Sequence, residues 1–323
     1  MSSPIPYFDG HNDALFRLWR DKSDTVLADF LNGSEKGHID LPRARTGHFV
    51  GGLFAVFSPS PRVNLGPSQG AMNVALPPLL PPEEAWAAAK EQIAVLFRLI
   101  AASEGRIVLC KSVADIRTAI ANNQLAVVLH MEGVDAIDES LDLLEVLYQA
   151  GLRSLGPVWS RPNAFGHGVP MQFPNSPDIG PGLTEAGKRL VRECNRLKIM
   201  IDLSHMNEKG FWDVAELSDA PLIATHSNVH AISASPRNLT ARQLDAIRDS
   251  DGFVGLNFAT SYLRDDGQMR ADTGVEWLVR HLDGLIEKLG EGRVGIGSDF
   301  DGAVVPAAIG SVAGITVLFD ALR

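Results

Sequence analysis

Short apolar runs alternate with longer amphipathic segments along almost the whole chain. Eight of these runs are rich in β-branched residues, and they cover residues 7–11, 49–57, 125–130, 154–159, 200–205, 222–226, 253–258 and 294–298. Nearly continuous hydrophobicity over such lengths is typical of parallel strands that are buried on both faces. A further short run at residues 107–109 indicates an additional strand.

The segments between several of the runs predict helices, because they are flanked by residues that begin or end helices. The clearest, each with its capping residue, are 113–122 (Ser112), 141–150 (Gly151), 185–197 (Thr184) and 241–250 (Thr240). This alternation predicts an α/β fold. About eight strands favour a (β/α)8 barrel of the TIM type, although a doubly wound open sheet gives a similar pattern. With 323 residues, we expect one domain over residues 1–323.

Two stretches are too long to be simple turns of such a barrel. Residues 58–82 are rich in proline, serine and glycine, and residues 161–182 carry several prolines. Long loops inserted into a compact domain are often lids or binding loops. Surface loops or loops that contact another subunit are an equally good interpretation.

Residue types that bind metal ions fall at the carboxyl ends of five predicted strands. They are His11 and Asp13 at the first run, Glu132 after the third, His205 and His226 at the ends of the fifth and sixth, and Asp299 after the last. All strands of a barrel end at one face, so these side chains should meet there. A single histidine at a strand end is more often structural, but the joint pattern predicts a metal site. Imidazole together with carboxylate suits zinc or a similar divalent ion.

Six short motifs, spread over almost the whole chain, resemble in order those of the membrane (renal) dipeptidase family of the amidohydrolase superfamily. They read DGHND, HMEG, IDLSHM, ATHSN, SPRNL and GSDFDG. Each motif is weak by itself, and the set is specific. The resemblance implies a metal-dependent dipeptidase with a small peptide substrate and two zinc ions per chain.

The resemblance also implies the metal ligands. His11 and Asp13 match the ligands of one zinc ion, His205 and His226 match those of the other, and Glu132 matches the carboxylate that bridges both. A bridging carboxylate would let two ions share one hydroxide nucleophile.

Residues that act on the substrate follow from the same resemblance. Asp299 matches the aspartate that serves as acid and base, and Arg237 matches the arginine that holds the terminal carboxylate of the substrate. An arginine offers two parallel donors to a carboxylate, which suits a short peptide with a free C-terminus. Tyr262 is expected to line the pocket.

One position departs from the family pattern. Many members place a histidine after the fourth strand, where it helps to hold the substrate carbonyl, and this chain has Trp159 there. Indole has one N–H donor and no charge. Either Trp159 substitutes weakly, or His167 or Arg161 takes over the task, or the substrate differs.

The composition of the chain disfavours some classes of binding partner. The formal net charge of −10 disfavours nucleic acid and anionic membranes. No stretch of about 18 apolar residues is present, and the start of the chain lacks the features of a signal peptide. We therefore expect a cytoplasmic protein without a membrane partner, and the sequence leaves a homodimer open. The only two cysteines, Cys110 and Cys194, are expected to be buried thiols.

Three functions compete at this point. The first is a zinc dipeptidase, the second is another amidohydrolase reaction on a lactam or cyclic amide, and the third is a non-catalytic metal-binding barrel. The third is disfavoured because a pure binder has no need of Asp299 beside the metals. The family usually continues beyond residues 315–323 with more helix, so we expect the C-terminal helical end to be trimmed.

Overall fold

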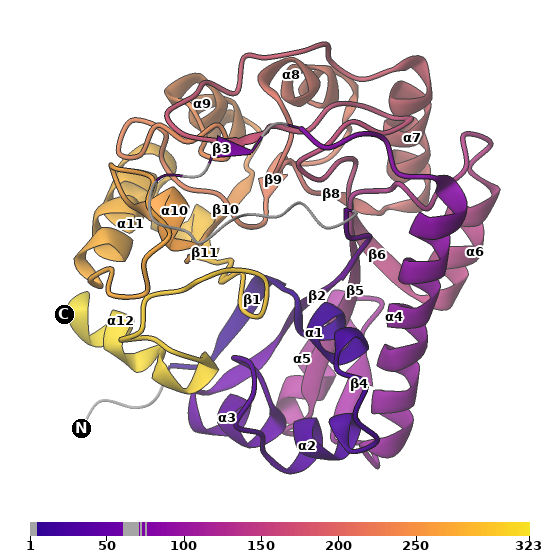
Figure 1. Ribbon diagram of the computed structural model, residues 1–323, viewed down its shortest axis with the longest axis vertical. Coiled ribbons are helices and arrows are strands. Elements are labelled where there is room, and N and C mark those ends of the chain that lie inside the picture. Colours follow the sequence, from indigo (N-terminus) through magenta and orange to yellow (C-terminus); the bar gives the residue numbers. More distant parts are fainter. Residues whose placement is uncertain (1–4, 61–70, 72, 75) are drawn as a thin grey trace.

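The strands of the protein form a ring that is surrounded by helices (Figure 1). The computed structural model describes residues 5–60, 71, 73–74 and 76–323. The ring consists of eight parallel strands: β1 (Tyr7–Asn12), β2 (Phe49–Phe57), β5 (Leu125–Glu132), β6 (Leu152–Gly156), β8 (Met200–Ile201), β9 (Ile223–Ala224), β10 (Phe253–Leu256) and β11 (Val294–Ile296). The expected extra strand, β4 (Ile107–Leu109), pairs with β5 outside the ring.

The two ends of the sheet meet, which closes the barrel almost completely. Strand order is β8-β6-β5-β2-β1-β11-β10-β9. Asp202, just after β8, forms a parallel bridge with Ile223 of β9. The Leu203 N–H donates to the Ile223 carbonyl at 2.8 Å. The (β/α)8 barrel is thus confirmed, and the open sheet is not the fold.

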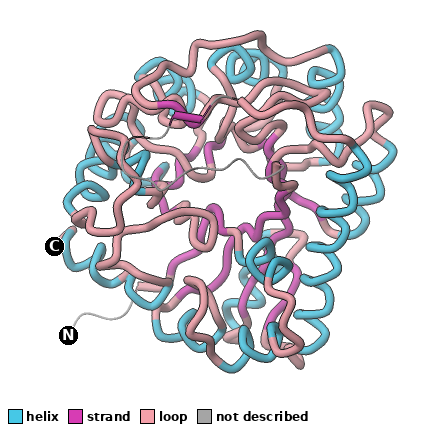
Figure 2. Tube along the Cα trace, viewed as in Figure 1, coloured by secondary structure: helices cyan, strands magenta, loops and turns pink. Residues whose placement is uncertain are grey.

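Helices cover the outside of the ring (Figure 2). They are α1 (Ala14–Arg20), α2 (Val26–Asn32), α3 (Leu41–Thr46), α4 (Pro82–Ala102), α5 (Val113–Ala121), α6 (Asp142–Ala150), α7 (Glu185–Leu197), α8 (Glu208–Leu217), α9 (Ala241–Asp249), α10 (Thr260–Leu263), α11 (Glu276–Leu289) and α12 (Thr316–Ala321). The expected caps are present: the side chains of Ser112, Thr184 and Thr240 accept N–H groups from the first turns of α5, α7 and α9. Gly151 ends α6 in a left-handed conformation.

Several strands end earlier than the apolar runs predict, as β8 does at Ile201 and β11 at Ile296. The backbone then turns at two site residues that follow these strands. His205 has a φ of 68° and Asp299 has a φ of 59°, so neither residue continues an extended strand. A non-glycine residue in the left-handed region is unfavourable by about 1–2 kcal/mol. Such conformations are often found at functional sites, where the surrounding structure imposes them.

The two long loops lie against each other. Strand β3 (Asn73–Val74) of the first loop pairs antiparallel with β7 (Met171–Gln172) of the second. Part of the first loop, residues 61–70, 72 and 75, lies outside the described residues. Within the described part of the chain, no helix has both the length and the apolar character needed to cross a bilayer.

Candidate active site

The predicted metal ligands converge at the carboxyl-terminal face of the barrel. His11 belongs to β1, Asp13 follows it, Glu132 ends β5, and His205 and His226 follow β8 and β9. All five are buried, with at most 6% of any residue exposed. The structure therefore brings together residues that are up to 215 positions apart in the sequence, from His11 to His226.

Glu132 lies at the centre of this cluster. Its Oε1 is 2.9 Å from His205 Nε2, 3.3 Å from His226 Nε2 and 3.6 Å from His11 Nε2. Asp13 Oδ2 lies 3.5 Å from His11 Nε2. Three compact groups of three potential ligands result, and two of them contain Glu132: one of His11, Asp13 and Glu132 and the other of Glu132, His205 and His226. Glu132 is common to both.

Burial determines the charge state of the histidines on the second group. Desolvation, reinforced by nearby positive charge from Arg237 and His11, lowers the pKa of His205 and His226 well below the usual value. Both imidazoles are therefore neutral near pH 7. A neutral imidazole is the form that binds metal ions.

The carboxylates of the site are unfavourable neighbours in the absence of a cation. Burial, together with Asp13 and Asp299, raises the pKa of Glu132 to about 8. Burial alone would lower the pKa of His11, but Glu132, Asp13 and Asp299 outweigh it and raise this pKa to about 10. The metal-free cluster consequently retains protons that a divalent cation would displace.

Hydrogen bonds direct the ligand atoms toward one point. Ser160 Oγ lies 2.9 Å from His205 Nδ1, and Thr225 Oγ1 lies 2.8 Å from His226 Nδ1. The Nε2 atoms of both rings are thus left to face Glu132. Both ring nitrogens of buried His11 have no hydrogen-bond partner among the described residues. The neutral imidazoles of His205 and His226, whose Nε2 atoms lie 3.2 Å apart beside a shared carboxylate, fit a divalent metal such as zinc.

Asp299 borders the cluster on the loop after β11. Asn257 Nδ2 donates to Asp299 Oδ2 at 3.0 Å, and the Asp299 N–H donates to the His11 carbonyl at 3.1 Å. Burial raises the pKa of this carboxyl group in the metal-free protein. Asp301 instead forms an ion pair with Arg17, with 2.9 Å between Asp301 Oδ2 and Arg17 Nε.

Arg237 lies within reach of the cluster and has donors to spare. It is 3% exposed, and its Nη2 donates to the His226 carbonyl at 3.2 Å. Its Nε and Nη1 have no hydrogen-bond partner among the described residues. The guanidinium lies 5.3 Å from the centre of the Tyr262 ring. A buried cation with two unused donors is suited to bind a carboxylate.

A cavity of about 1320 Å³ opens above the cluster, and described residues of both long loops, including Ser60, Val74 and Met171, border it. This supports the interpretation of these segments as binding loops. Trp159 lines the cavity, 5.9 Å from the His205 ring and 4.9 Å from the Phe57 ring between centroids. The wall beside the second ligand group is therefore aromatic.

The two alternatives to Trp159 occupy other surroundings. Arg161 is fully buried, and its Nε donates to Asp135 at 2.8 Å while its Nη1 donates to Ser60 at 2.8 Å. These contacts tie the loop after β2 to the loops after β5 and β6. His167 is not among the described residues that line the cavity. Of the three candidates at this position, only Trp159 faces the cavity.

Sequence reasoning missed the residues that support the ligands, namely Ser160, Asp202, Thr225 and Asn257. Asp202 gave a usable signal, because a carboxylate inside the apolar run before His205 is expensive to bury without a partner. The others carried none, because hydroxyl and amide groups are common in loops.

A barrel with this cluster at its catalytic face defines a metal-dependent hydrolase. The chain belongs to the membrane dipeptidase family (peptidase family M19), whose model matches residues 1–323, and it is accordingly a metal-dependent dipeptidase. Two bacterial relatives are described only as uncharacterized proteins. The one from Acinetobacter calcoaceticus, in the PQQ-III 3′ region, is 44% identical over 88% of this chain and 90% of its own. The one from Klebsiella pneumoniae, in the pqqA 5′ region, is 51% identical over 72% of this chain and 86% of its own.

Solved structures agree with this assignment. A metallopeptidase from Rhodobacter sphaeroides, liganded with a phosphinate mimic of the dipeptide L-Ala-D-Ala, is 52% identical, with a TM-score of 0.95 over 99% of this chain and 93% of its own. An M19 metallopeptidase named dipeptidase AC is 53% identical, with a TM-score of 0.94 over 99% and 92%. The probable dipeptidase PvdM of Pseudomonas aeruginosa, at 22% identity and a TM-score of 0.81 over 98% of this chain and 89% of its own, shares the fold.

Gly302 has no side chain, and this leaves room for the carboxyl groups of Asp13 and Asp299 beside it. A Cβ atom there would lie 2.0 Å from Asp13 Oδ2 and 2.7 Å from Asp299 Oδ1. We expect Gly302→Ala to displace both carboxylates and to lower kcat/KM for dipeptides by about 10–100-fold, since misplacement by about 1 Å can cost that much. Steady-state kinetics measure the loss. Gly292→Ala is the control, because nothing lies within 4 Å of that position. Unchanged kinetics in Gly302→Ala would contradict the prediction.

Proposed function

We propose that the protein hydrolyses dipeptides that have a free C-terminal carboxylate, with two zinc ions bound at the cluster. His11, Asp13 and Glu132 would hold one ion, and Glu132, His205 and His226 the other. The observation that carries the proposal is the position of Glu132 Oε1, within 3.6 Å of the Nε2 atoms of all three histidines. One carboxylate shared by two ligand groups is the arrangement of a two-metal site.

The chemistry of the proposed reaction divides between the metals and the protein. Zinc, when held by His11, Asp13, Glu132, His205 and His226, would supply a water molecule of lowered pKa and would polarise the carbonyl group of the peptide bond. Asp299 handles the proton: its Oδ2 already accepts from Asn257, so Oδ1 is the atom that takes the proton from the attacking water. The same oxygen then delivers this proton to the leaving amine nitrogen.

Recognition of the substrate is assigned to Arg237 and the aromatic residues. The unused Nε and Nη1 of Arg237 would bind the terminal carboxylate of the dipeptide. Tyr262 packs against the guanidinium and Trp159 faces the cavity, so both would contact the substrate. The structure from Rhodobacter sphaeroides, with its phosphinate mimic of L-Ala-D-Ala, supports a dipeptide substrate for this chain as well.

Arg237 also separates the proposed function from its main alternative. A lactam or cyclic amide need not carry a free carboxylate beside the scissile bond, and a buried guanidinium with two unused donors would then have no partner. Because buried polar groups without partners are unfavourable by about 1–3 kcal/mol or more, a charged ligand is the better explanation.

The number of metal ions tests the central claim. We expect about two zinc ions per wild-type chain by elemental analysis. Glu132→Ala should lose at least one ion and nearly all activity, because both ligand groups lose a member. Glu84→Ala is the matched control, since Glu84 lines the same cavity from an exposed position and should leave both ions bound. Fully active wild-type protein that holds one ion or none would refute the bridging role of Glu132.

The role of Arg237 predicts a difference between two substrates. Arg237→Ala should lower kcat/KM for a free dipeptide by about 30-fold or more, because a desolvated charge pair is lost. This corresponds to a loss of about 2–5 kcal/mol in the free energy of transition-state binding. The corresponding dipeptide amide should lose much less. Arg237→Lys retains the positive charge near the metals and serves as control for electrostatic effects on the ligands. Equal losses for the acid and the amide would reject this assignment.

Trp159 is expected to favour apolar substrate side chains. Trp159→Ala should raise KM for bulky apolar dipeptides by about tenfold, since burying a large apolar side chain is favourable by about 1.5–3 kcal/mol. Dipeptides with glycine should change little, and Trp159→His should shift selectivity toward that of typical family members. An unchanged ratio of kcat/KM between bulky and glycine-containing dipeptides would show that Trp159 has no part in selectivity.

A further inference from the structure

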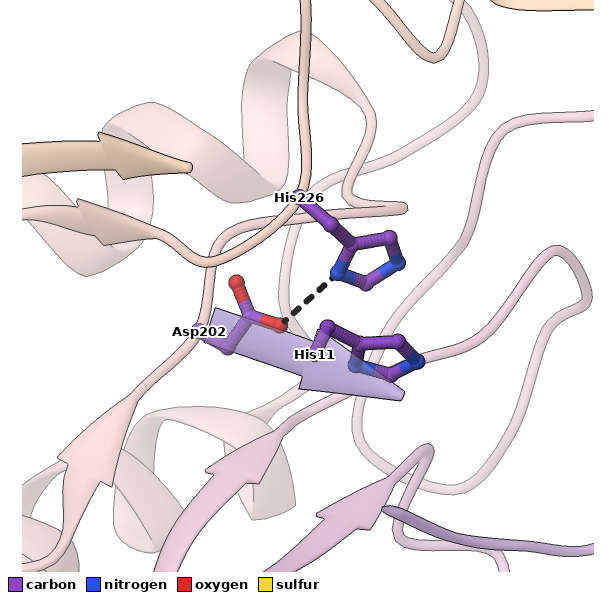
Figure 3. A group of neighbouring side chains, drawn as sticks. All are labelled: His11, Asp202 and His226. Carbon is purple, nitrogen blue, oxygen red and sulfur yellow. Dashed lines mark ion pairs between the residues drawn. The ribbon is translucent and has the colours of Figure 1, made fainter. Parts of the chain in front are cut away.

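A further buried carboxylate, Asp202, lies beside the candidate metal ligands and faces the Nδ1 atom of His226. Asp202 is 1% exposed, and its Oδ2 lies 3.8 Å from His226 Nδ1, the contact drawn in Figure 3. Glu132, in contrast, faces Nε2 of the same ring. The His226 ring also stacks on the His11 ring, with 3.8 Å between centroids. Both the plane of this ring and its surroundings are thus fixed.

A hydroxyl group lies between this carboxylate and the histidine. Thr225 Oγ1 is 2.6 Å from Asp202 Oδ2 and 2.8 Å from His226 Nδ1. Asp202 Oδ1 accepts the N–H groups of Thr225 at 2.8 Å and of Ser204 at 3.0 Å. Three donors converge on Asp202, so both of its carboxyl oxygens accept hydrogen bonds in this arrangement.

The hydrogen bonds from Asp202 through Thr225 to His226 leave one placement of the hydrogen atoms. A carboxylate can only accept, so the single hydrogen of the Thr225 hydroxyl must point to Asp202. The Thr225 oxygen can then only accept from His226, which requires the hydrogen of the imidazole on Nδ1. The lone pair of the ring is consequently on Nε2, the atom that faces Glu132.

We propose that Asp202 is a positioning residue that acts through Thr225 to hold His226 in the tautomer able to bind metal through Nε2. The inference rests on the proposed role of His226 as a metal ligand. Partners of this kind fix the orientation of ligand histidines and typically change metal affinity by about 10–100-fold.

A third metal site at Asp202 is not the better interpretation. His11, Asp202 and His226 do form a compact group of potential ligands. However, Asp202 Oδ2 and His226 Nδ1 already share the Thr225 hydroxyl. A cation bound to Nδ1 would require His226 to lose its only ring hydrogen if Nε2 also binds metal.

We call the hydrogen-bonded series Asp202–Thr225–His226 the relay. His205, which follows the neighbouring strand β8, has no relay of this kind among the described residues. His205 Nδ1 lies 2.9 Å from Ser160 Oγ. In the part of the chain that the structure describes, no carboxylate accepts a hydrogen bond from this serine. The Ser160 hydroxyl can therefore donate or accept, so it does not select a tautomer. The relay is specific to His226.

Asp202→Asn reverses the relay and provides the test. The two backbone N–H groups hold the amide oxygen at the position of Oδ1, so the amide NH₂ takes the place of Oδ2 and donates to Thr225. The Thr225 hydroxyl must then donate to His226 Nδ1, which moves the ring hydrogen to Nε2. We expect nitrogen-15 NMR of metal-free protein to show this change in the His226 signal, identified by its loss in His226→Asn. Competition with a chromophoric chelator should show a 10–100-fold loss of Zn²⁺ affinity at one site.

Two substitutions of Thr225 complete the experiment and decide it even if Asp202→Asn does not fold. Thr225→Ser keeps the hydroxyl and should bind Zn²⁺ as the wild type does. Thr225→Val removes the hydroxyl without reversing the relay, so its affinity should fall, but less than that of Asp202→Asn. A His226 hydrogen that stays on Nδ1 in Asp202→Asn, or wild-type affinity in Thr225→Val, would overturn the inference. Because the tautomer is measured without metal, absence of zinc at His226 in the wild type would sink only the proposed function.

Discussion

The crowding of buried negative charge around Glu132 is the constraint on which the site depends. Glu132, Asp13 and Asp299 lie close together beneath the cavity, and burial, together with the two neighbouring carboxylates, raises the pKa of Glu132 to about 8 in the absence of a cation. Removing charges from water costs several kcal/mol per ion unless partners compensate. Glu132 ends β5, and Asp13 and Asp299 follow closely after β1 and β11. The barrel thus holds the three carboxylates at distances that positive charge makes favourable.

Much of this organisation could be predicted from the sequence, because the signals were strong and repeated. The buried strands read as continuous apolar runs, and the helix caps at Ser112, Thr184 and Thr240 are local in sequence. The candidate ligands could be grouped because a barrel places all strand ends on one face. This topological rule alone predicts that His11 lies near His226.

What could not be predicted depends on geometry that no local pattern encodes. The apolar run that ends at His205 suggested a longer strand, but the backbone turns into a left-handed conformation at that residue. The choice among Trp159, Arg161 and His167 also needed the structure. Arg161 carries the charge expected of a substrate-binding residue, yet its hydrogen bonds to Asp135 and Ser60 are already made inside the protein.

The pairing of β3 with β7 joins the two long loops outside the barrel, so the loops and the barrel tolerate sequence change differently. The strands of the barrel carry the candidate metal ligands, and every change there disturbs many neighbours at once. Among the residues of the two long loops that the structure describes, two residue pairs form the ladder that joins them. Substitutions, insertions or deletions in these loops can accumulate while the barrel is conserved. Relatives of this enzyme could therefore diverge in the dipeptides they accept long before they diverge in the reaction they perform.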